Sequence, residues 1–144
     1  MEEGLKSSQA VMHPMKLLFV CVGNSCRSQM AEALAKSMGF EAASAGTHPA
    51  ASVAPHALTL LEQRGLPTQG LVPKSVDLMD ETDFDMVISM GCGVACPNMK
   101  IHEDWGLDDP VGQSYDVYEA TAARIEERLQ IIRHQLESTG SPSP

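Results

Sequence analysis

A short loop with a cysteine at one end and an arginine at the other separates an expected strand from an expected helix near the start of the chain. Leu17–Val20 is a continuous apolar run, which is typical of a strand buried on both faces. The residues after Arg27 are strong helix formers, and they predict a helix over Ser28–Met38. Cys21 therefore lies at the carboxyl end of a strand and faces a helix N-terminus, which restricts the chain to folds built from strand–loop–helix units.

This loop has the chemistry of an anion site that contains a nucleophile. Unpaired backbone amides and the positive end of the helix dipole attract an oxyanion, and the Arg27 guanidinium can bind two of its oxygens. The same field favours the thiolate form of Cys21, although a buried structural cysteine on a tight turn is the alternative interpretation. The loop residues that we expect to bind the oxyanion are Val22, Gly23, Asn24, Ser25, Cys26, Arg27 and Ser28.

Apolar runs and helical patterns alternate along the rest of the chain, as in βαβ units. We predict further strands over Phe40–Ser44, Met86–Met90 and near Lys100–His102, and further helices over Ser52–Arg64 and Asp116–Leu136. The expected fold is α/β, a single domain with a central four-stranded parallel sheet and helices on both faces. In such sheets ligands bind at the carboxyl ends of the strands near a topological switch point, where Cys21 falls.

The length of 144 residues suits one domain, which we expect over residues 15–137 between a flexible extension (1–14) and a flexible tail (138–144). Lys and Arg number 10 against 19 Asp and Glu, and the net charge of −9 argues against nucleic acid or an anionic membrane as a partner. An export signal is not expected, and four cysteines in a chain of this size indicate catalysis in a reducing compartment, the cytoplasm.

The stretch Cys21–Glu32, with the sequence CVGNSCRSQMAE, resembles the opening motif of the low-molecular-weight protein tyrosine phosphatase superfamily. It is most similar to the arsenate reductase branch, in which Ser25 and Gln29 are the expected residues. Phosphatase members more often carry a bulky aliphatic residue and a proline at these two places. The resemblance implies a flavodoxin-like topology and arsenate as the substrate, with phosphate and sulfate as competing anions.

Two more cysteines follow the expected strand Met86–Met90, at the same edge of the sheet as Cys21. Three residues separate Cys92 from Cys96, a spacing that allows a disulfide if the backbone refolds locally. The alternatives are a pair of packed small residues, or a zinc site completed by His102 or His48. The resemblance favours a redox pair, because thioredoxin-coupled arsenate reductases carry two cysteines after this strand, usually with a longer spacing.

Cys26 lies inside the anion loop, and its role stays open between an inert structural residue and a protective disulfide with Cys21.

A late Asp-Pro pair supplies the expected proton donor. Displacing an oxygen from an oxyanion requires protonation of that oxygen, and a carboxylic acid opposite the sulfur can provide the proton. By resemblance the general acid is Asp109, which immediately precedes Pro110. Val111 and Gly112 follow, where tyrosine phosphatases usually carry an aromatic residue, so a small inorganic substrate is favoured over a phosphotyrosyl peptide.

These residues lead to a mechanistic hypothesis. Cys21 attacks arsenate held by the loop and Arg27, while Asp109 protonates the departing hydroxide. Cys92 then attacks the Cys21 sulfur, arsenite leaves, and Cys96 attacks Cys92 to form a disulfide that thioredoxin reduces. One alternative is a phosphatase that hydrolyses phosphoesters through a Cys21 phosphoenzyme. Another is an anion- or metal-binding regulatory module.

Further polar residues are assigned by resemblance alone. Family members use the equivalents of Asn24, Glu32, Ser44 and Asp77 around the loop, in some cases to bind a potassium ion. Ordinary roles are the alternative, with Glu32 stabilised by the helix dipole and Asp77 as a turn residue. We expect no tightly bound cofactor apart from such an ion, and a monomer. The last helix is expected to pack on the core through Val117, Ala120, Ile125, Leu129, Ile132 and Leu136.

Overall fold

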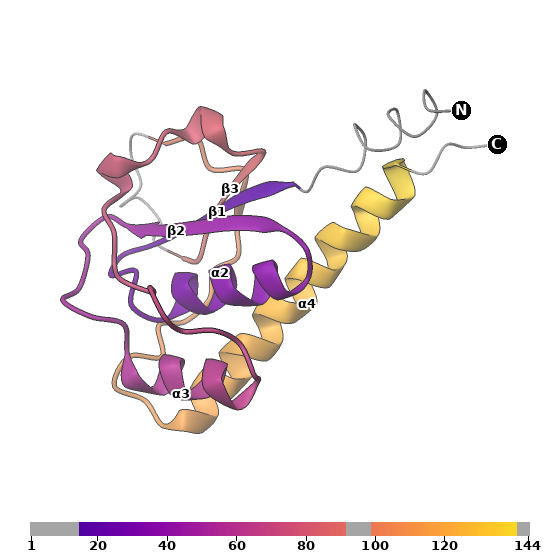
Figure 1. Cartoon of the computed structure of the whole chain (residues 1–144). Helices are drawn as coiled ribbons and strands as arrows, with labels where there is room; N and C mark the ends of the chain where they lie inside the picture. Colours follow the sequence, from indigo (N-terminus) through magenta and orange to yellow (C-terminus); the bar gives the residue numbers. More distant parts are fainter. Residues whose placement is uncertain (1–14, 92–98, 141–144) are drawn as a thin grey trace.

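A computed structural model describes residues 15–91 and 99–140 of the chain. Its centre is a four-stranded parallel sheet, as expected, with the strand order β2-β1-β3-β4 (Figure 1). The strands are β1 (Lys16–Cys21), β2 (Glu41–Gly46), β3 (Met86–Ser89) and β4 (Glu103–Asp104). The helices are α2 (Arg27–Ser37), α3 (Pro55–Gln63) and α4 (Tyr115–Gly140), with two short 3₁₀ helices, η1 (Val76–Leu78) and η2 (Glu81–Asp83).

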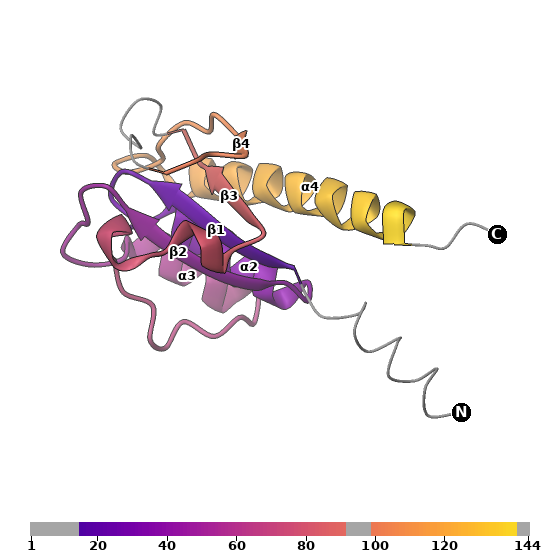
Figure 2. The same ribbon diagram turned by 90° about the horizontal axis from the view of Figure 1, so that it is seen from above.

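The two faces of the sheet are covered differently (Figures 1 and 2). All three α-helices pack on the face formed by Leu17 and Phe19, where they enclose the larger hydrophobic core. The opposite face, formed by Leu18 and Val20, is covered by the segment that contains η1 and η2. Helices therefore lie on both faces, as expected. Those on the second face are the short 3₁₀ helices η1 and η2, because the chain between α3 and β3 crosses there.

The edge strand β4 lies later in the sequence than expected. It was predicted near Lys100–His102, but Ile88 pairs with Glu103 and Ser89 with Asp104. The polar side chains of Glu103 and Asp104 suit an edge strand exposed to water, and they also explain why an apolar pattern does not reveal it.

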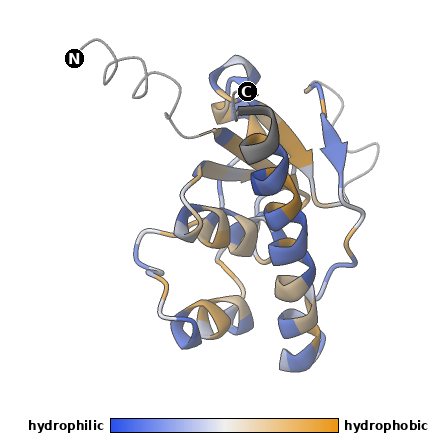
Figure 3. Cartoon of the chain, turned by 90° about the vertical axis from the view of Figure 1, so that its right-hand side faces the viewer, coloured by the Kyte–Doolittle hydropathy of each residue, from blue (hydrophilic) through white to orange (hydrophobic). Residues whose placement is uncertain are grey.

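Helix α4 packs through one narrow stripe of side chains. Its buried hydrophobic members are Tyr118, Ala122, Ile125, Leu129 and Ile132, which follow one another at intervals of three or four residues. The expected stripe was therefore wrong at Ala120, which is exposed, and α4 continues to Gly140 rather than ending at Leu136. The outward face of α4 is mainly hydrophilic (Figure 3). None of the described helices is long and apolar enough to cross a membrane.

The topology places the anion loop at the switch point of the sheet. The chain leaves β1 toward β2 on one side and later returns to β3 on the other side of β1. The carboxyl ends of these strands meet at one edge, where Cys21 pairs with Gly46 and Val20 pairs with Ser89. A crevice at such an edge is the usual ligand site of an open parallel sheet.

Two adjacent isoleucines on α4 test the packing of this helix. Ile132 is 4% exposed and Ile131 is 48% exposed. Replacing Ile132 by Ala should lower the free energy of unfolding by about 2–5 kcal/mol, because a buried side chain leaves a cavity. Ile131→Ala, the matched control, should change it by less than about 1 kcal/mol. Urea denaturation of both variants measures the difference, and equal losses would contradict this orientation of α4.

Candidate active site

Cys21 ends β1 with its sulfur inside the loop that follows. The residue is 2% exposed, and the amide of Asn24 donates a hydrogen bond to Cys21 Sγ over 3.1 Å. Ser28 Oγ lies 2.9 Å from the same sulfur and shares a hydrogen bond with it. Both contacts come from groups that can donate a hydrogen bond to a negatively charged sulfur. The position therefore suits a thiolate nucleophile.

The backbone carbonyl groups of residues 21–25 point outward from the loop. The strap, which we define as residues 47–54, receives most of them through its backbone amides. The hydrogen bonds run from Thr47 N to Cys21 O (3.1 Å), His48 N to Val22 O (2.8 Å), Ala50 N to Gly23 O (2.9 Å) and Ala54 N to Ser25 O (2.8 Å). In a trans peptide the C=O and N–H groups point in opposite directions. The amides of the loop are therefore turned toward its interior, where they form a site for an anion.

Asn24 fixes the tightest point of the loop. Its backbone is left-handed, with φ of 50°, a conformation that asparagine adopts more readily than most residues. The side chain is fully buried and donates to Ser28 Oγ over 2.7 Å, while its Oδ1 accepts from the amide of Lys74 over 2.8 Å. Gln29 Nε2 donates to the backbone oxygen of Asn24 over 3.0 Å and so satisfies the remaining loop carbonyl.

Arg27 is held by two backbone carbonyls from other strand ends. Its Nη1 donates to Leu107 O over 2.7 Å and to Met90 O over 3.1 Å, and its side chain is 6% exposed. Among the described residues, the buried Nε of Arg27 has no hydrogen-bond partner. The two hydrogen bonds of Nη1 therefore orient the guanidinium, and Nε remains able to donate a hydrogen bond to an oxyanion in the loop.

Asp109 lies beside the loop, as expected for a proton donor. Its Oδ2 is 3.9 Å from Arg27 Nη2, and its side chain is 54% exposed. Its Oδ1 accepts hydrogen bonds from the amide of Val111 (3.1 Å) and from the thiol of Cys26 (3.4 Å). The structure thus brings the nucleophile loop, the arginine and the expected acid together at one edge of the sheet.

Cys26 differs chemically from Cys21 although both lie in the same loop. It is 2% exposed, and burial, together with the nearby Asp109 carboxylate, raises the pKa of the Cys26 thiol to about 12. The thiol therefore stays protonated at neutral pH and acts as a hydrogen-bond donor. Cys21 and Cys26 are both free thiols in this structure.

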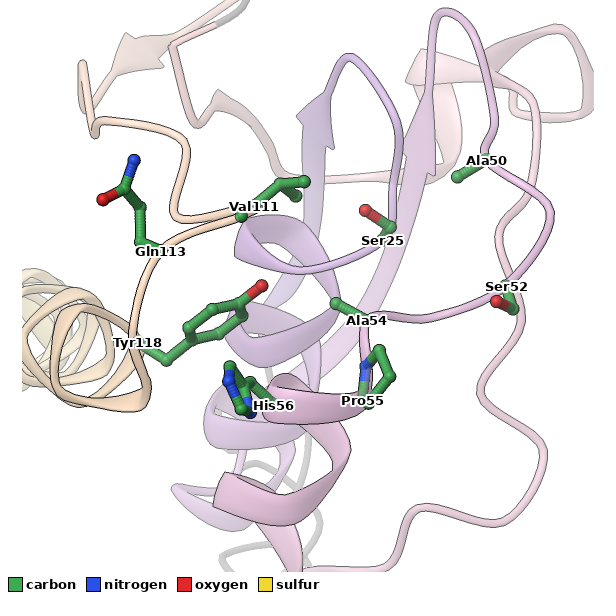
Figure 4. Close-up of a pocket in the computed structure, with 10 residues that line it drawn as sticks. Ser25, Ala50, Ser52, Ala54, Pro55, His56, Val111, Gln113 and Tyr118 are labelled. Atoms are coloured by element: carbon green, nitrogen blue, oxygen red, sulfur yellow. The ribbon is translucent and has the colours of Figure 1, made fainter.

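A cavity of about 540 Å³ opens beside the loop (Figure 4). Ser25 of the loop and Val111, which follows the Asp109–Pro110 pair, form one side of it. His56 and Tyr118 lie on the other side, from α3 and α4, and the Tyr118 hydroxyl points toward Val111 and Ser25 in Figure 4. The cavity is much larger than a tetrahedral oxyanion, so a second molecule or an organic group can reach the loop from here.

Comparison with known proteins agrees with this geometry. Residues 16–141 match the family described as low molecular weight phosphotyrosine protein phosphatase. The chain belongs to this family. Within it, the glutaredoxin arsenate reductase of Synechocystis sp. is 38% identical over 123 residues, which cover 80% of this chain and 93% of that protein. The resemblance to arsenate reductases is confirmed.

Solved structures that are similar to this chain include both reductases and phosphatases. An arsenate reductase in the phosphate-binding state is 36% identical with a TM-score of 0.77, over 85% of this chain and 98% of that one. The YwlE arginine phosphatase from Geobacillus stearothermophilus is 25% identical with a TM-score of 0.71, over 88% and 95% of the two chains. The fold is thus shared by enzymes of both kinds.

The potassium site suggested by the resemblance stays a prediction, and the structure shows that its carboxylate, Glu32, is already paired. Glu32 binds Ser44 Oγ through Oε1 (2.7 Å), and its Oε2 already pairs with the Lys36 ammonium group at 2.7 Å. The Lys74 ammonium group lies 4.0 Å from Oε1, and Asp77 is exposed at the start of η1. Lysine charges therefore neutralise the Glu32 carboxylate, and a potassium ion would have to displace them.

The second cysteine pair lies outside the described residues, so the structure leaves Cys92 and Cys96 as predictions. No group of three or more His, Cys, Asp or Glu side chains in the described part of the chain is arranged to hold a metal ion. His102 Nδ1 accepts a hydrogen bond from the Val87 amide over 3.0 Å, so one ring nitrogen of this proposed zinc ligand is already used.

The sequence interpretation missed the residues that support the loop from outside. Lys74 and Gln29 hold Asn24, and Gly46 lies directly under the loop. A Cβ atom on Gly46 would lie 2.6 Å from Val22 O. Gln29 was expected only as a residue of the arsenate reductase branch, without a structural role, and a glycine at the end of β2 is by itself typical of an ordinary strand end.

Two glycines near the loop provide a matched test of this packing. Gly46→Ala should lower the free energy of unfolding by about 1–3 kcal/mol and weaken phosphate binding, because the new methyl group displaces the Val22 carbonyl. Gly23→Ala should change stability by less than about 1 kcal/mol, since its Cβ would meet only ordinary contacts at 3.5 Å or more. Urea denaturation with and without phosphate measures both effects. Equal behaviour of the two variants would disprove the close approach.

The raised pKa of Cys26 makes stability depend on pH. The unfolded thiol ionises near its ordinary pKa of 9.0 and the folded thiol near about 12, so its stabilisation is complete below pH 9 and is lost as pH rises toward 12. Relative to Cys26→Ser, which does not titrate, the free energy of unfolding should fall by up to about 1.4 kcal/mol per pH unit in this window. Urea denaturation between about pH 8 and about pH 11 measures the slope, and parallel curves for the two proteins would contradict it.

Proposed function

We propose that this protein reduces arsenate to arsenite, with Cys21 as the nucleophile. The observation that carries the proposal is the buried Cys21 sulfur inside a ring of inward amides, with Arg27 Nε unpartnered among the described residues and Asp109 beside it. A tetrahedral oxyanion fits this set of donors, and the relatives named above include arsenate reductases.

The first step forms a bond between Cys21 Sγ and arsenic. The thiolate attacks arsenate, the amides and Arg27 stabilise the negative oxygens, and Asp109 protonates the departing hydroxide so that water leaves. The acidic chain, with a net charge of −9, attracts the anion only through these local groups. Phosphate and sulfate have the same shape and compete for the site.

The second step transfers two electrons to arsenic. In our proposal the Cys92 thiolate attacks Cys21 Sγ, the electron pair of the S–As bond passes to arsenic, and arsenite departs. Cys96 then attacks Cys92, which releases the Cys21 thiolate and leaves a Cys92–Cys96 disulfide. This relay rests on the sequence, because both residues lie outside the described part of the chain.

A dithiol protein must return the disulfide to thiols. Thioredoxin is our first choice of donor, and the name of the Synechocystis relative makes glutaredoxin the second. We place the enzyme in the cytoplasm, because four cysteines in a chain of this size suit a reducing compartment, and we expect a monomer.

Arsenate-dependent consumption of NADPH tests the proposal. The intact chain is assayed with thioredoxin and thioredoxin reductase, and in parallel with glutaredoxin, glutathione and glutathione reductase. Cys21→Ser should abolish turnover with either donor, because the attacking sulfur is lost. Cys92→Ser and Cys96→Ser should each lower turnover at least about 100-fold with thioredoxin, because the relay is broken. The assay with glutaredoxin shows whether an external thiol can replace them.

Hydrolysis of phosphoesters is the second candidate function, and the cavity beside the loop favours it. That cavity has room for an organic group attached to a phosphate bound in the loop (Figure 4). A protein that hydrolyses phenyl phosphate rapidly but consumes no NADPH with arsenate would be a phosphatase. Retention of either activity by Cys21→Ser would show that Cys21 is not the nucleophile, whereas an intact chain with neither activity would be an anion-binding module.

A further inference from the structure

We propose that Cys26 is a positioning residue for the general acid, because its thiol fixes which oxygen of Asp109 carries the proton. The inference rests on the proposed function only in that Asp109 acts as the acid. It gives a defined role to the one loop cysteine that the reaction itself does not use.

The two oxygens of Asp109 have different surroundings. Oδ1 accepts two hydrogen bonds, from the Cys26 thiol (3.4 Å) and the Val111 amide (3.1 Å). Oδ2 accepts neither of these bonds and faces Arg27 Nη2 at 3.9 Å. In a protonated carboxyl group the carbonyl oxygen accepts hydrogen bonds while the hydroxyl oxygen donates one. In the protonated acid that the reaction requires, these bonds therefore favour the proton on Oδ2, the oxygen on the side of Arg27.

Cys26 is suited to this task by its position at the start of α2. It is 2% exposed, and its own backbone oxygen accepts from Met30 N over 2.9 Å, so the residue is anchored in the first turn of the helix. Its high pKa keeps the thiol a donor throughout the working range of the enzyme. Tyr118, which is 3% exposed, lies close to Asp109: burial, with the negative charge of Asp109 adding to it, raises the pKa of the Tyr118 hydroxyl.

The two cysteines of the loop therefore have different roles. The Cys21 sulfur accepts hydrogen bonds and attacks, whereas the Cys26 thiol donates a hydrogen bond and never reacts. Without the thiol, Asp109 loses one of the two donors that hold Oδ1, and the carboxyl group can rotate so that either oxygen carries the proton. Protonation of the leaving oxygen then slows, while binding of the anion is unchanged.

A pair of variants, Cys26→Ala and Cys26→Ser, separates this role from simple packing. Serine keeps a donor and alanine removes it, and both are compared with Asp109 intact and with Asp109→Asn. Hydrolysis of phenyl phosphate and p-nitrophenyl phosphate is measured beside arsenate reduction. Phenoxide needs protonation to leave and p-nitrophenoxide needs little, so a fault in the acid affects the first ester more.

The expected result for Cys26→Ala is a fall in kcat of about tenfold on phenyl phosphate and less than about threefold on p-nitrophenyl phosphate, with KM changed by less than about twofold. Cys26→Ser should retain most of kcat. In the Asp109→Asn background Cys26→Ala should cause no additional loss. Equal losses on both esters, or equal losses with and without Asp109, would overturn the proposal in favour of a packing role.

A spectroscopic measurement needs no activity at all. In a protein whose only cysteine is Cys26, made with Cys21→Ser, Cys92→Ser and Cys96→Ser, the infrared S–H stretching band reports the hydrogen bond directly. Asp109→Ala should move this band toward that of a free thiol. An unchanged band would refute the contact. Because neither this band nor the phosphoester assays involve arsenate, failure of the proposed function would be seen separately as absent NADPH consumption.

Discussion

The site depends on the hydrogen bonds between the loop carbonyls of residues 21–25 and the strap formed by residues 47–54. Four strap amides and the Gln29 side chain take up these carbonyls, which leaves the loop amides facing inward. A loop of this kind is stable without its anion only because every outward oxygen is satisfied. Catalytic geometry is therefore built into the backbone of β1, the loop and the strap, and Cys21 is placed by this framework rather than by its own contacts.

The electrostatics of the site are local in a strongly acidic molecule. The net charge of −9 repels anions at a distance, whereas Arg27, the amides and the start of α2 attract them at contact. Salt screens the long-range repulsion, so it should speed the encounter of an anion with the protein. It also screens the attraction at contact, so it should weaken anion binding. The ion pair with Lys36 neutralises Glu32 and so removes a negative charge close to the loop, which also favours an anion at the site.

The fold was predicted from the sequence, and so was the proximity of Cys21, Arg27 and Asp109, the residues that we propose to react, whereas the residues that support the loop were not. Three features could be recognised because each depends on residues that are neighbours in the chain, and the structure brings them together as expected. They are the strand Leu17–Val20, the Cys21–Arg27 spacing and the Asp109–Pro110 pair. The strap, Lys74 and Gly46 act through backbone contacts between distant segments, which leave no side-chain pattern. The edge strand β4 was misplaced for a similar reason, because polar residues at an exposed edge show no apolar alternation.

Arg27 has a second consequence through its bonds to Met90 and Leu107. The Arg27 guanidinium joins the start of α2 to the end of β3 and to the segment after β4. The group that we propose to bind the anion therefore also holds three segments of the fold together. Any occupant of the loop that orders Arg27 therefore tightens three segments at once, and by mass action it stabilises the folded state. Under the proposed function, inorganic phosphate would both compete with the substrate at the loop and stabilise the folded domain.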